Sequence, residues 1–510
     1  MISKTTLLAI LILPVFSVFG QAGTLDPTYA DNAEIKLLNF LPADEELLTH
    51  SITDSQDRTW IAGQTFQNGD WRMILTRLDA DGNYDTNFGG TGHAVLNLGG
   101  NNVEEVQGLA LQGNDLVVAG KIVENGTSNP YLMRYTEEGF LDTDFGDNGI
   151  HVSSLEMSVT DMTTDSNQNI YITGVGSDDN IVVVKYLPNG EPDDSFGFFG
   201  FNQFDFPSTD QSVAIDLDEE GNVYVMGYGT LNGTMRGHIS CLTATGALNT
   251  EFTGNSRKSI TWPNDKQFYV SDGLFDASTS SFFLVGRAYD SEDNNLNTAA
   301  VKIGLNSEQD MSFSEDGWFE NDLGIGGDDF ANYILKGPGG FYIAANVQEI
   351  PEGINSTVIH IDEAGQRVQS FGNSGVATIN INELGADQAL SLTTQSDGKI
   401  ILTGVAASQE SGIYGYAARI LTSNPLSTDS REVLHQAAVY PNPAVNFIRV
   451  SVDGFTGENP LYRIMDLDGR IVLEGRLNHA DQSIDVSALT SGAYILQLDN
   501  CKPTTWLKAK

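Results

Sequence analysis

The sequence has 510 residues, a formal net charge of −42 at pH 7 and 53 glycines. A chain of this length can bury a large core, and so acidic a surface repels nucleic acid phosphates and anionic lipid head groups, which excludes both as expected partners. There are two cysteines, Cys241 and Cys501, so no disulfide framework is expected, and Cys241 is predicted to be a small core residue.

The charge is unevenly spread along the chain. Residues 424–510 hold 8 Lys and Arg against 10 Asp and Glu, a charge of −2, so the remaining −40 lies in residues 1–423. The two regions are therefore expected to be physically different parts. The acidity of the first is interpreted as a solubility device, with cation binding as the alternative.

Residues 1–20 have the pattern of a secretory signal peptide. Lys4 provides the positive start, Thr5–Phe16 is a short apolar run, and Val18 and Gly20 suit signal peptidase. Cleavage is predicted near Gly20. The apolar run is too short for a spanning helix with polar flanks, and no later stretch reaches about 20 apolar residues, so no membrane span is expected.

A repeat of about 57 residues occupies the next 400 residues. One marker is a glycine that ends a short apolar run, at Gly63, Gly120, Gly174, Gly227, Gly286 and Gly404, with Ala345 in the gap. A second marker is a mostly basic position eleven residues before a motif aromatic, in the pairs Arg77 and Phe88, Arg134 and Phe145, Lys185 and Phe196, Cys241 and Phe252, Lys302 and Phe313, and His360 and Phe371. Such constant spacing predicts a loop of fixed conformation.

Each repeat is predicted to form four short strands. In the second repeat these are Val106–Leu111, Leu116–Ile122, Tyr131–Tyr135 and Gly149–Ser153, with a polar turn between the first two. No stretch keeps an amphipathic helical period. Four strands at this period are typical of a β-propeller blade, so the expected fold class is all-β.

The chain ends predict how the ring closes. The seventh repeat has strands at Ala389–Gln395, Lys399–Val405 and Tyr416–Thr422 but neither motif nor fourth strand. The missing piece stands at the N-terminus, as Leu25–Tyr29 followed by Ala33–Phe40. We therefore expect a seven-bladed β-propeller, closed by the N-terminal strand, which leaves no open sheet edge.

These motifs resemble the delta-60 repeat, a β-propeller repeat of bacterial secreted proteins. The best matches are QSDGKIILTG at 395–404, MRYTEEGFLDTDFGDNG at 133–149 and TRLDADGNYDTNFGGTG at 76–92. The resemblance covers residues 23–423 and implies the propeller fold, with no common chemistry attached. The fifth repeat departs from it at Asp276–Thr279 and at Asp310–Phe313.

Residues 436–510 form a separate module of short alternating segments, predicted as a small Ig-like β-sandwich. The segments are Phe447–Val452, Tyr462–Leu467, Gly469–Leu473, Ile484–Leu489 and Gly492–Leu498. The YPNP at Tyr440–Pro443, the element Asp466–Arg470, IDVSAL at 484–489 and the final Lys508 and Lys510 resemble the type A C-terminal sorting domain of the type IX secretion system. An unrelated adhesion module is the alternative.

That resemblance implies a Bacteroidota-type bacterium and engagement of the type IX secretion machinery. The protein would cross the periplasm, leave through the outer membrane, lose the module, and end as a secreted or surface-attached protein. Residues 424–435 would be the polar linker in which cleavage takes place.

Basic and acidic residues eight positions apart recur in the repeats: Arg77 and Asp85, Arg134 and Asp142, Lys185 and Asp193, Lys302 and Asp310, and, across the closure, Arg419 and Asp26. Because the pairs follow the repeat, the preferred interpretation is a structural ion pair that holds the motif loop; a ring of charged sites is the alternative. Asp79–Gly82 and Asp216–Gly221 suggest calcium weakly, since neither has the EF-hand order, and turns are preferred.

No catalytic, cofactor-binding or metal-binding residue is assigned. The seven histidines (His50, His93, His151, His238, His360, His435 and His479) are scattered, and no HExxH, GxSxG, P-loop or CxxC pattern is present. Ser314–Trp318 has only a single, misplaced likeness to a sialidase Asp-box. Enzymatic activity is therefore not the favoured hypothesis, although propellers can build sites from distant loops.

Loops between the second and third strands vary in length and composition, and function usually lies on variable loops carried by a rigid scaffold. They are residues 65–70, 122–129, 176–180, 229–237, 288–298, 348–356 and 406–415. Tyr289, Tyr414 and Trp71 are predicted to be exposed there and to stack on sugars or partner side chains. The leading hypothesis is a non-enzymatic propeller that binds a glycan or protein on this face; the rivals are a hydrolase or lyase of an extracellular polymer and a structural surface-coat protein.

Overall fold

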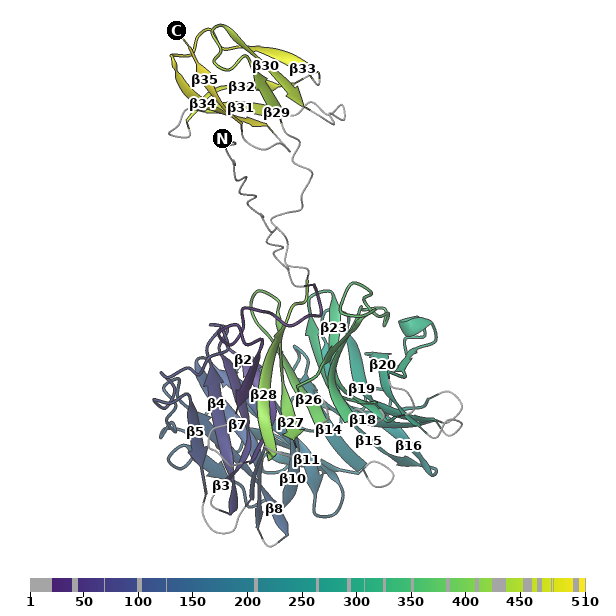
Figure 1. Ribbon diagram of the computed structural model, residues 1–510. Helices are drawn as coiled ribbons and strands as arrows, with labels where there is room; N and C mark the ends of the chain where they lie inside the picture. Colours follow the sequence, from purple (N-terminus) through teal and green to yellow (C-terminus); the bar gives the residue numbers. More distant parts are fainter. Residues whose placement is uncertain are drawn as a thin grey trace, which may run out of the picture. The chain divides into compact units, whose positions relative to one another are not determined.

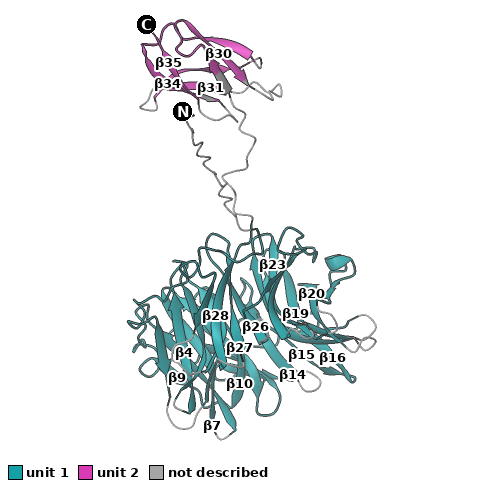
Figure 2. Cartoon of the chain, in the orientation of Figure 1, with its two compact units in different colours: residues 1–425 teal, residues 426–510 magenta. Residues whose placement is uncertain are grey.

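The computed structural model describes residues 21–38, 45–67, 69–98, 103–124, 126–205, 210–262, 266–290, 295–306, 308–323, 327–349, 353–381, 386–408, 412–423, 437–452, 461–465, 470–477, 479, 481–498 and 504–509. The predicted signal peptide at 1–20 and the predicted linker at 424–435 lie outside these residues. The chain divides into two compact units, Met1–Pro425 and Leu426–Lys510 (Figure 2).

In its described residues the first unit consists of β-sheets (Figure 1), joined by turns that include the short 3-10 turn η2 at Phe313–Glu315. Its first five sheets each contain four consecutive strands. They are the first sheet β2–β5 (Glu45–Thr53, Thr59–Gln67, Asp70–Leu78, His93–Leu96), the second β6–β9 (Val103–Gln112, Asp115–Glu124, Thr127–Tyr135, Ile150–Val152), the third β10–β13 (Met157–Thr164, Ile170–Gly176, Ile181–Tyr186, Phe201–Phe204), the fourth β14–β17 (Asp210–Leu217, Val223–Leu231, Thr234–Leu242, Arg257–Ile260) and the fifth β18–β21 (Gln267–Asp276, Ser281–Asp290, Asn295–Gly304, Trp318–Asn321).

Two further groups of four strands follow, linked by a single parallel pairing between Ile354 and Ala386. The sixth sheet is β22–β25 (Asp329–Gly337, Gly340–Glu349, Gly353–Ile361, Val376–Ile379), and the closing sheet is β26–β28 with β1 (Ala386–Thr394, Ile400–Ser408, Gly412–Ile420, Ile35–Leu38). In the closing sheet, β1 pairs antiparallel with β28, with Ile35 opposite Ala418 and Leu38 opposite Gly415. The prediction that the N-terminal strand completes the last sheet is confirmed.

The first strand of each sheet contacts the first strands of its two neighbours, in the order β2, β6, β10, β14, β18, β22, β26 and back to β2. Each of these seven strands carries one β-bulge at an equivalent position, for example between Leu48 and His50 in β2. A bulge increases local twist, which suits sheets packed face to face around a common centre. The middle strands are buried almost throughout, so the core lies between neighbouring sheets.

The predicted strand positions agree with the structure to within a few residues. In the second sheet the four predicted segments fall on β6 to β9. Strands β6 and β7 extend beyond both predicted ends, and β8 begins four residues before its predicted start. The fifth repeat, whose motif is irregular, still forms a full sheet, with η2 in place of the motif glycine turn. The hairpin register there is regular from Ser281 to Asp290.

The second unit contains a three-stranded and a four-stranded sheet. The strands are β29 to β35, at Ala437–Tyr440, Phe447–Val452, Leu461–Met465, Ile471–Arg476, Asp481–Asp485, Gly492–Leu498 and Thr504–Lys508, in the orders β29-β30-β33 and β32-β31-β34-β35. Side chains from both sheets share one core around Trp506, which is fully buried against Tyr494. Strands β29 and β35 are not among the segments that the sequence predicts.

Candidate functional site

All five predicted basic and acidic pairs form ion pairs in the first unit. The nitrogen–oxygen distances are 2.8 Å for Arg77–Asp85, 2.6 Å for Arg134–Asp142, 2.9 Å for Lys185–Asp193, 3.1 Å for Lys302–Asp310 and 3.0 Å for Arg419–Asp26. The last pair joins the two ends of the unit in the closing sheet. Hydrogen bonds from the Asp144 backbone and from Arg134 hold the pKa of Asp142 below its usual value, although burial opposes this.

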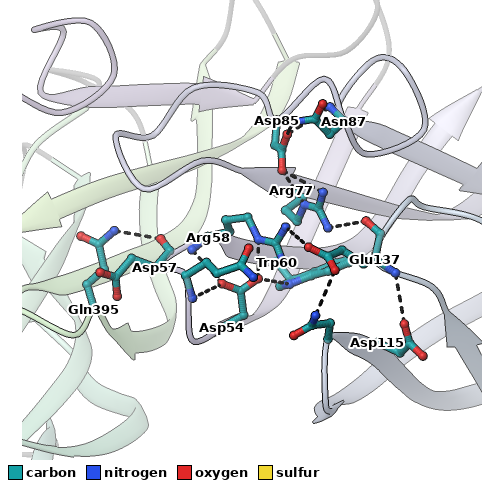
Figure 3. Close-up of polar contacts among 12 residues, drawn as sticks. Asp54, Asp57, Arg58, Trp60, Arg77, Asp85, Asn87, Asp115, Glu137 and Gln395 are labelled. Atoms are coloured by element: carbon teal, nitrogen blue, oxygen red, sulfur yellow. Dashed lines mark hydrogen bonds and ion pairs between the residues drawn. The ribbon is translucent and has the colours of Figure 1, made fainter.

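The arginine of each motif also reaches the next sheet, as Figure 3 shows for Arg77. Its Nε donates to Asp85 Oδ2 at 2.8 Å, and its Nη1 donates to the backbone oxygen of Glu137 on the second sheet at 2.5 Å. The guanidinium carbon lies 4.7 Å from the Trp60 ring and 5.2 Å from the Phe88 ring. Only 1% of the Arg77 side chain is exposed, so this charge holds the boundary between two sheets and is not available to a ligand.

A second polar network lies beside it, in the lower part of Figure 3. Arg58 bonds Asp54 Oδ2 and Glu137 Oε1, each at 2.7 Å, and Trp60 donates its indole N–H to Asp54. On the other side of the first sheet, Gln395 Nε2 donates to the backbone oxygen of Asp57 at 3.0 Å. The first sheet is thus bound by polar contacts to both of its neighbours.

The backbone of the motif loop repeats the same connection. After six of the seven motif aromatics, the next residue donates an N–H to a carbonyl in the next sheet. The bonds run from Gly89 to Glu138, Gly146 to Asn189, Gly197 to Thr245, Ser314 to Ala364, Gly372 to Ala22 and Ala30 to Asp81, at 2.7–2.9 Å. The last two involve the N-terminal segment, which is therefore bonded to both the sixth and the first sheet. The structure favours the interpretation of the motif as a scaffold element over a ring of charged sites.

Two repeats lack the basic residue and use other contacts. His360 is 3% exposed and stacks on Tyr342, with ring centroids 4.1 Å apart. Burial lowers the pKa of His360 to about 4, so the ring is neutral at pH 7. Cys241 is fully buried, and burial raises the pKa of its thiol to about 12, which agrees with the prediction of an inert core residue.

The aspartates considered for calcium lie in turns. Asp79 Oδ1 accepts the backbone N–H groups of Asp81 and Asn83, and Asp218 Oδ1 accepts that of Asn222. Asp216 points instead to the next sheet. Among the residues that the structure describes, no group of three or more His, Cys, Asp or Glu side chains is arranged to hold a metal ion.

Three carboxylates on first strands form inter-sheet contacts that the sequence interpretation missed. Asp161 accepts the backbone N–H of Ile215, Asp216 that of Phe275, and Asp272 that of Ile334, at 2.8–2.9 Å. The first strand of each sheet has a strand neighbour on one side only, so its other edge offers unpaired N–H groups. Each carboxylate satisfies one such group on the following sheet.

Burial is the main cause of the raised pKa values of these three carboxylates, and repulsion by neighbouring carboxylates adds to it for Asp161 and Asp272. The pKa of Asp272 rises to about 7, and that of Asp161 lies well above its ordinary value. Asp161 and Asp272 both directly follow the β-bulge of their strand. Aligning the repeats by that position would have revealed the pair; Asp216 stands elsewhere in its repeat.

The aromatic side chains predicted to be exposed on the variable loops are half-buried or buried in the structure. Tyr414 is 7% exposed, so the prediction for this residue is wrong: it belongs to the core of the sixth and closing sheets. Trp71 is half-buried and packs on Phe66 with centroids 5.3 Å apart, and Tyr289 is half-buried. Parts of five of these loops, at 68, 125, 291–294, 350–352 and 409–411, lie outside the described residues.

A cluster of three aromatic rings and one cation lies near the variable-loop end of the fourth to sixth sheets. The Arg287 guanidinium carbon is 5.3 Å from the Tyr269 ring and 5.8 Å from the Phe330 ring, and Tyr228 meets Tyr269 edge-on at 5.9 Å. All four side chains are half-buried. Within the described residues the side chain of Arg287 has no hydrogen bond and no ion pair, unlike the side chains of Arg77 and Arg134.

The sequence interpretation also missed Arg287. It directly follows the repeat marker Gly286, a position held elsewhere by residues such as Gln64, Val175 and Val405. A basic residue at that position, in a region with a net charge of −40, was the sequence signal that could have identified Arg287. Lys121 occupies it in the second sheet but is paired with Glu105 at 3.1 Å.

Comparisons with known proteins agree with this architecture. Residues 438–508 match the family described as "Secretion system C-terminal sorting domain", and residues 59–88 and 114–145 match the family described as "Domain of unknown function (DUF5122) beta-propeller". No curated protein matches the chain. The part of the chain that the structure describes contains no helix with the length and apolar character required to cross a membrane.

Solved structures similar to this chain share little sequence with it. PorZ of Porphyromonas gingivalis, a surface component of its type IX secretion system, is 12% identical with a TM-score of 0.38, over 92% of this chain and 60% of PorZ. A protein of unknown function from Dyadobacter fermentans is 7% identical (TM-score 0.41, 76% and 98% covered), and the β-propeller domain of the Trilobed protease from Pyrococcus furiosus is 5% identical (0.42, 76% and 100%). All three TM-scores lie below 0.5, too low to carry over the activities of those proteins.

The repeated sheets, the two family matches and the C-terminal unit lead to one conclusion. The first unit is a β-propeller in which residues 59–88 and 114–145 match DUF5122, and residues 438–508 are a C-terminal sorting domain of type IX secretion, which directs the protein through the periplasm to the cell surface or the extracellular space.

Proposed function

We propose that this protein is a seven-bladed propeller, closed by its N-terminal strand, that works outside the cell as a binding or adhesion protein without a catalytic role. Its parts would be a signal peptide at 1–20, the propeller at 23–423, a linker at 424–435 and an Ig-like sorting domain at 436–510. The cycle of contacts between the seven first strands supports the ring, and the pairing of β1 with β28 supports its closure.

The observation that carries the binding role is the environment of Arg287. The basic side chains of the five motif pairs are used within the fold, whereas the Arg287 guanidinium lies beside two aromatic rings and has no hydrogen-bond partner among the described residues. An arginine that is flanked by aromatic rings loses little entropy when it binds a ligand. Its planar fork suits a carboxylate or a sulfate ester.

The ligand that fits this cluster is a glycan or protein segment with one acidic group among hydroxylated or apolar surroundings. The rings of Tyr228, Tyr269 and Phe330 would stack on a sugar or a side chain, and Arg287 would hold the acidic group. A densely charged polyanion is disfavoured because residues 1–423 carry a charge of −40.

The proposal is tested with the mature chain on an array of neutral, carboxylated and sulfated glycans. Arg287→Ala is expected to weaken binding to an acidic glycan at least tenfold, because the charge-assisted hydrogen bonds are lost. Lys258→Ala, a half-buried cation on the outer strand β17, removes the same charge elsewhere and should leave binding unchanged. Equal losses in both variants, or no retained acidic glycan, would contradict the role of Arg287.

The same glycans are incubated with the protein and examined for cleavage products. No turnover is expected. Turnover that one acidic loop substitution abolishes would overturn the binding-only proposal and favour the hydrolase or lyase alternative.

The proposed boundaries of the sorting domain are tested by fusing residues 436–510 to a periplasmic reporter. In a type IX secreting bacterium the reporter should reach the cell surface or the medium. Retention in the periplasm would show that these residues are not a sufficient address.

A further inference from the structure

The motif loop of the third sheet differs from all other copies. Between its two glycines stand Phe198 and Phe199, where other repeats have Gly90-Thr91, Asp147-Asn148 or Asn373-Ser374. Phe198 is 70% exposed and Phe199 69% exposed, the largest values among the exposed large hydrophobic side chains of the described residues. Their rings meet edge-on with centroids 4.5 Å apart. A pair of aromatic rings therefore stands in solvent on a strongly acidic unit.

The fold gains nothing from phenylalanine at these positions. Phe199 has φ of 52°, in the left-handed region, where Asn148 (55°) and Ser374 (54°) stand in other repeats. Small polar residues tolerate this conformation, but a bulky aromatic residue there is strained. Because the exposed rings bury little surface in return, the strain indicates a function for the pair.

A hollow of about 440 Å³ adjoins the pair. It is lined by Phe198, Phe201, Asn202 and Gln203 of the third sheet and by 245–247 of the fourth. Asn202 donates its amide N–H to the backbone oxygen of Gly246, and Gln203 donates to Asp178 Oδ2 at 2.6 Å. These bonds orient the two amides and leave their oxygens as acceptors.

We propose that this surface, Phe198 and Phe199 with the adjoining hollow, binds a neutral sugar unit of an extracellular glycan. The C–H face of a pyranose ring would stack on the aromatic pair, and sugar hydroxyls would donate to the amide oxygens of Asn202 and Gln203. The site is separate from Arg287, since its residues belong to the third and fourth sheets, whereas Arg287 lies on β19 of the fifth sheet.

Size and charge favour a sugar over the other occupants. Two phenylalanines at this exposure offer roughly 300 Å² of apolar surface, well below the about 800 Å² per partner of a stable protein interface. Anionic polymers are opposed by the charge of the unit and by Asp178 beside the hollow.

The test is affinity electrophoresis of the mature chain in gels that contain laminarin, dextran or yeast mannan, with heparin as the anionic probe. We expect at least one neutral polysaccharide to retard the wild type. The double variant Phe198→Asp with Phe199→Asn introduces the residues that the second repeat has at these positions, so it should fold with an equal or higher melting temperature. Its affinity for the neutral polysaccharide should fall at least tenfold. Arg287→Ala should still be retarded, which separates this site from the proposed acidic-ligand site.

Phe140→Asn is the matched control, because Phe140 is 67% exposed in the second sheet but does not line this hollow. Its variant should bind as the wild type does. Retardation by heparin alone, no retardation in any neutral gel, or equal retardation of the double variant would overturn the proposal. If the wild type is a dimer in gel filtration and the double variant is a monomer, the aromatic pair serves self-association, and the sugar-binding proposal is overturned as well.

Discussion

The first and sixth sheets hold the same motif loop by different side-chain chemistry. In the first, Arg77 bonds Asp85 and reaches the second sheet; in the sixth, His360 stacks on Tyr342 instead. The backbone bonds are nevertheless the same: Asp85 N to Arg77 O and Val368 N to His360 O are both 2.9 Å. The loop conformation therefore depends on the backbone, the buried aromatic and the glycines, and the charge is an addition that fastens neighbouring sheets.

The largest effect is expected for Arg77→Ala. Removing Arg77 leaves the carboxylate of Asp85 buried without its partner and removes a bond to the second sheet, so we expect a loss of about 3–5 kcal/mol in the free energy of unfolding. Urea unfolding of the mature chain measures it. Lys258→Ala is the control, since it removes a half-buried cation of the same unit on β17, and its effect should be much smaller. Equal effects would contradict the fastening role.

Arg134→Ala should have a smaller effect of the same kind. The side chains of this pair are 16% and 19% exposed, against 1% and 7% for Arg77 and Asp85. Because water can solvate the Asp142 carboxylate after its partner is removed, we expect the free energy of unfolding to fall by about 2 kcal/mol. Calorimetric melting should show that the loss of stability decreases in the order Arg77→Ala, Arg134→Ala, Lys258→Ala. Loss of ligand binding by Arg134→Ala at unchanged stability would instead favour a ring of charged sites.

Much of the motif loop and its side-chain contacts was predictable from the sequence because the motif repeats along the chain. The spacing of Arg134 to Phe145 and the split copy at Leu25–Tyr29 predicted the loop and the N-terminal strand, since a repeated conformation requires repeated residues. Features that occur once were not predicted. Arg287 and the Phe198–Phe199 pair break the repeat, and only the structure shows what surrounds them.

Asp272→Asn tests a second difference: the motif aspartates are ionised in their ion pairs, whereas the buried carboxylates of the first strands have raised pKa values. The pKa of Asp272 is raised by burial to about 7, so the folded state binds more protons than the unfolded state between about pH 4 and pH 7. Its contribution to stability is complete below pH 4 and is lost as the pH rises to about 7. The melting temperature of Asp272→Asn should therefore fall less steeply than that of the wild type over this range; parallel curves would contradict the raised pKa.

The smallest effect is expected for His360→Phe, which keeps a ring against Tyr342 and removes the titration. The pKa of His360 is lowered by burial to about 4, so its contribution is present above the unfolded value of about 6.5 and is lost as the pH falls towards 4. The variant should lose less stability than the wild type on acidification through that range. An unchanged acid limb of the melting curve would show that His360 is not the group responsible.

The pairing of β1 with β28 has a consequence for folding. Arg419 and Asp26 are separated by 393 positions in the chain, so their contact closes a very long loop and carries an entropic cost. The other six sheets can form from consecutive strands, whereas this one must wait for both ends of the unit. It should form last during folding and open first in hydrogen exchange. In a circular permutant that joins residue 423 to residue 21 and opens between two other sheets, Arg419 and Asp26 would lie close in the chain. The delay would be removed, and the new chain ends would no longer be held together by this ion pair.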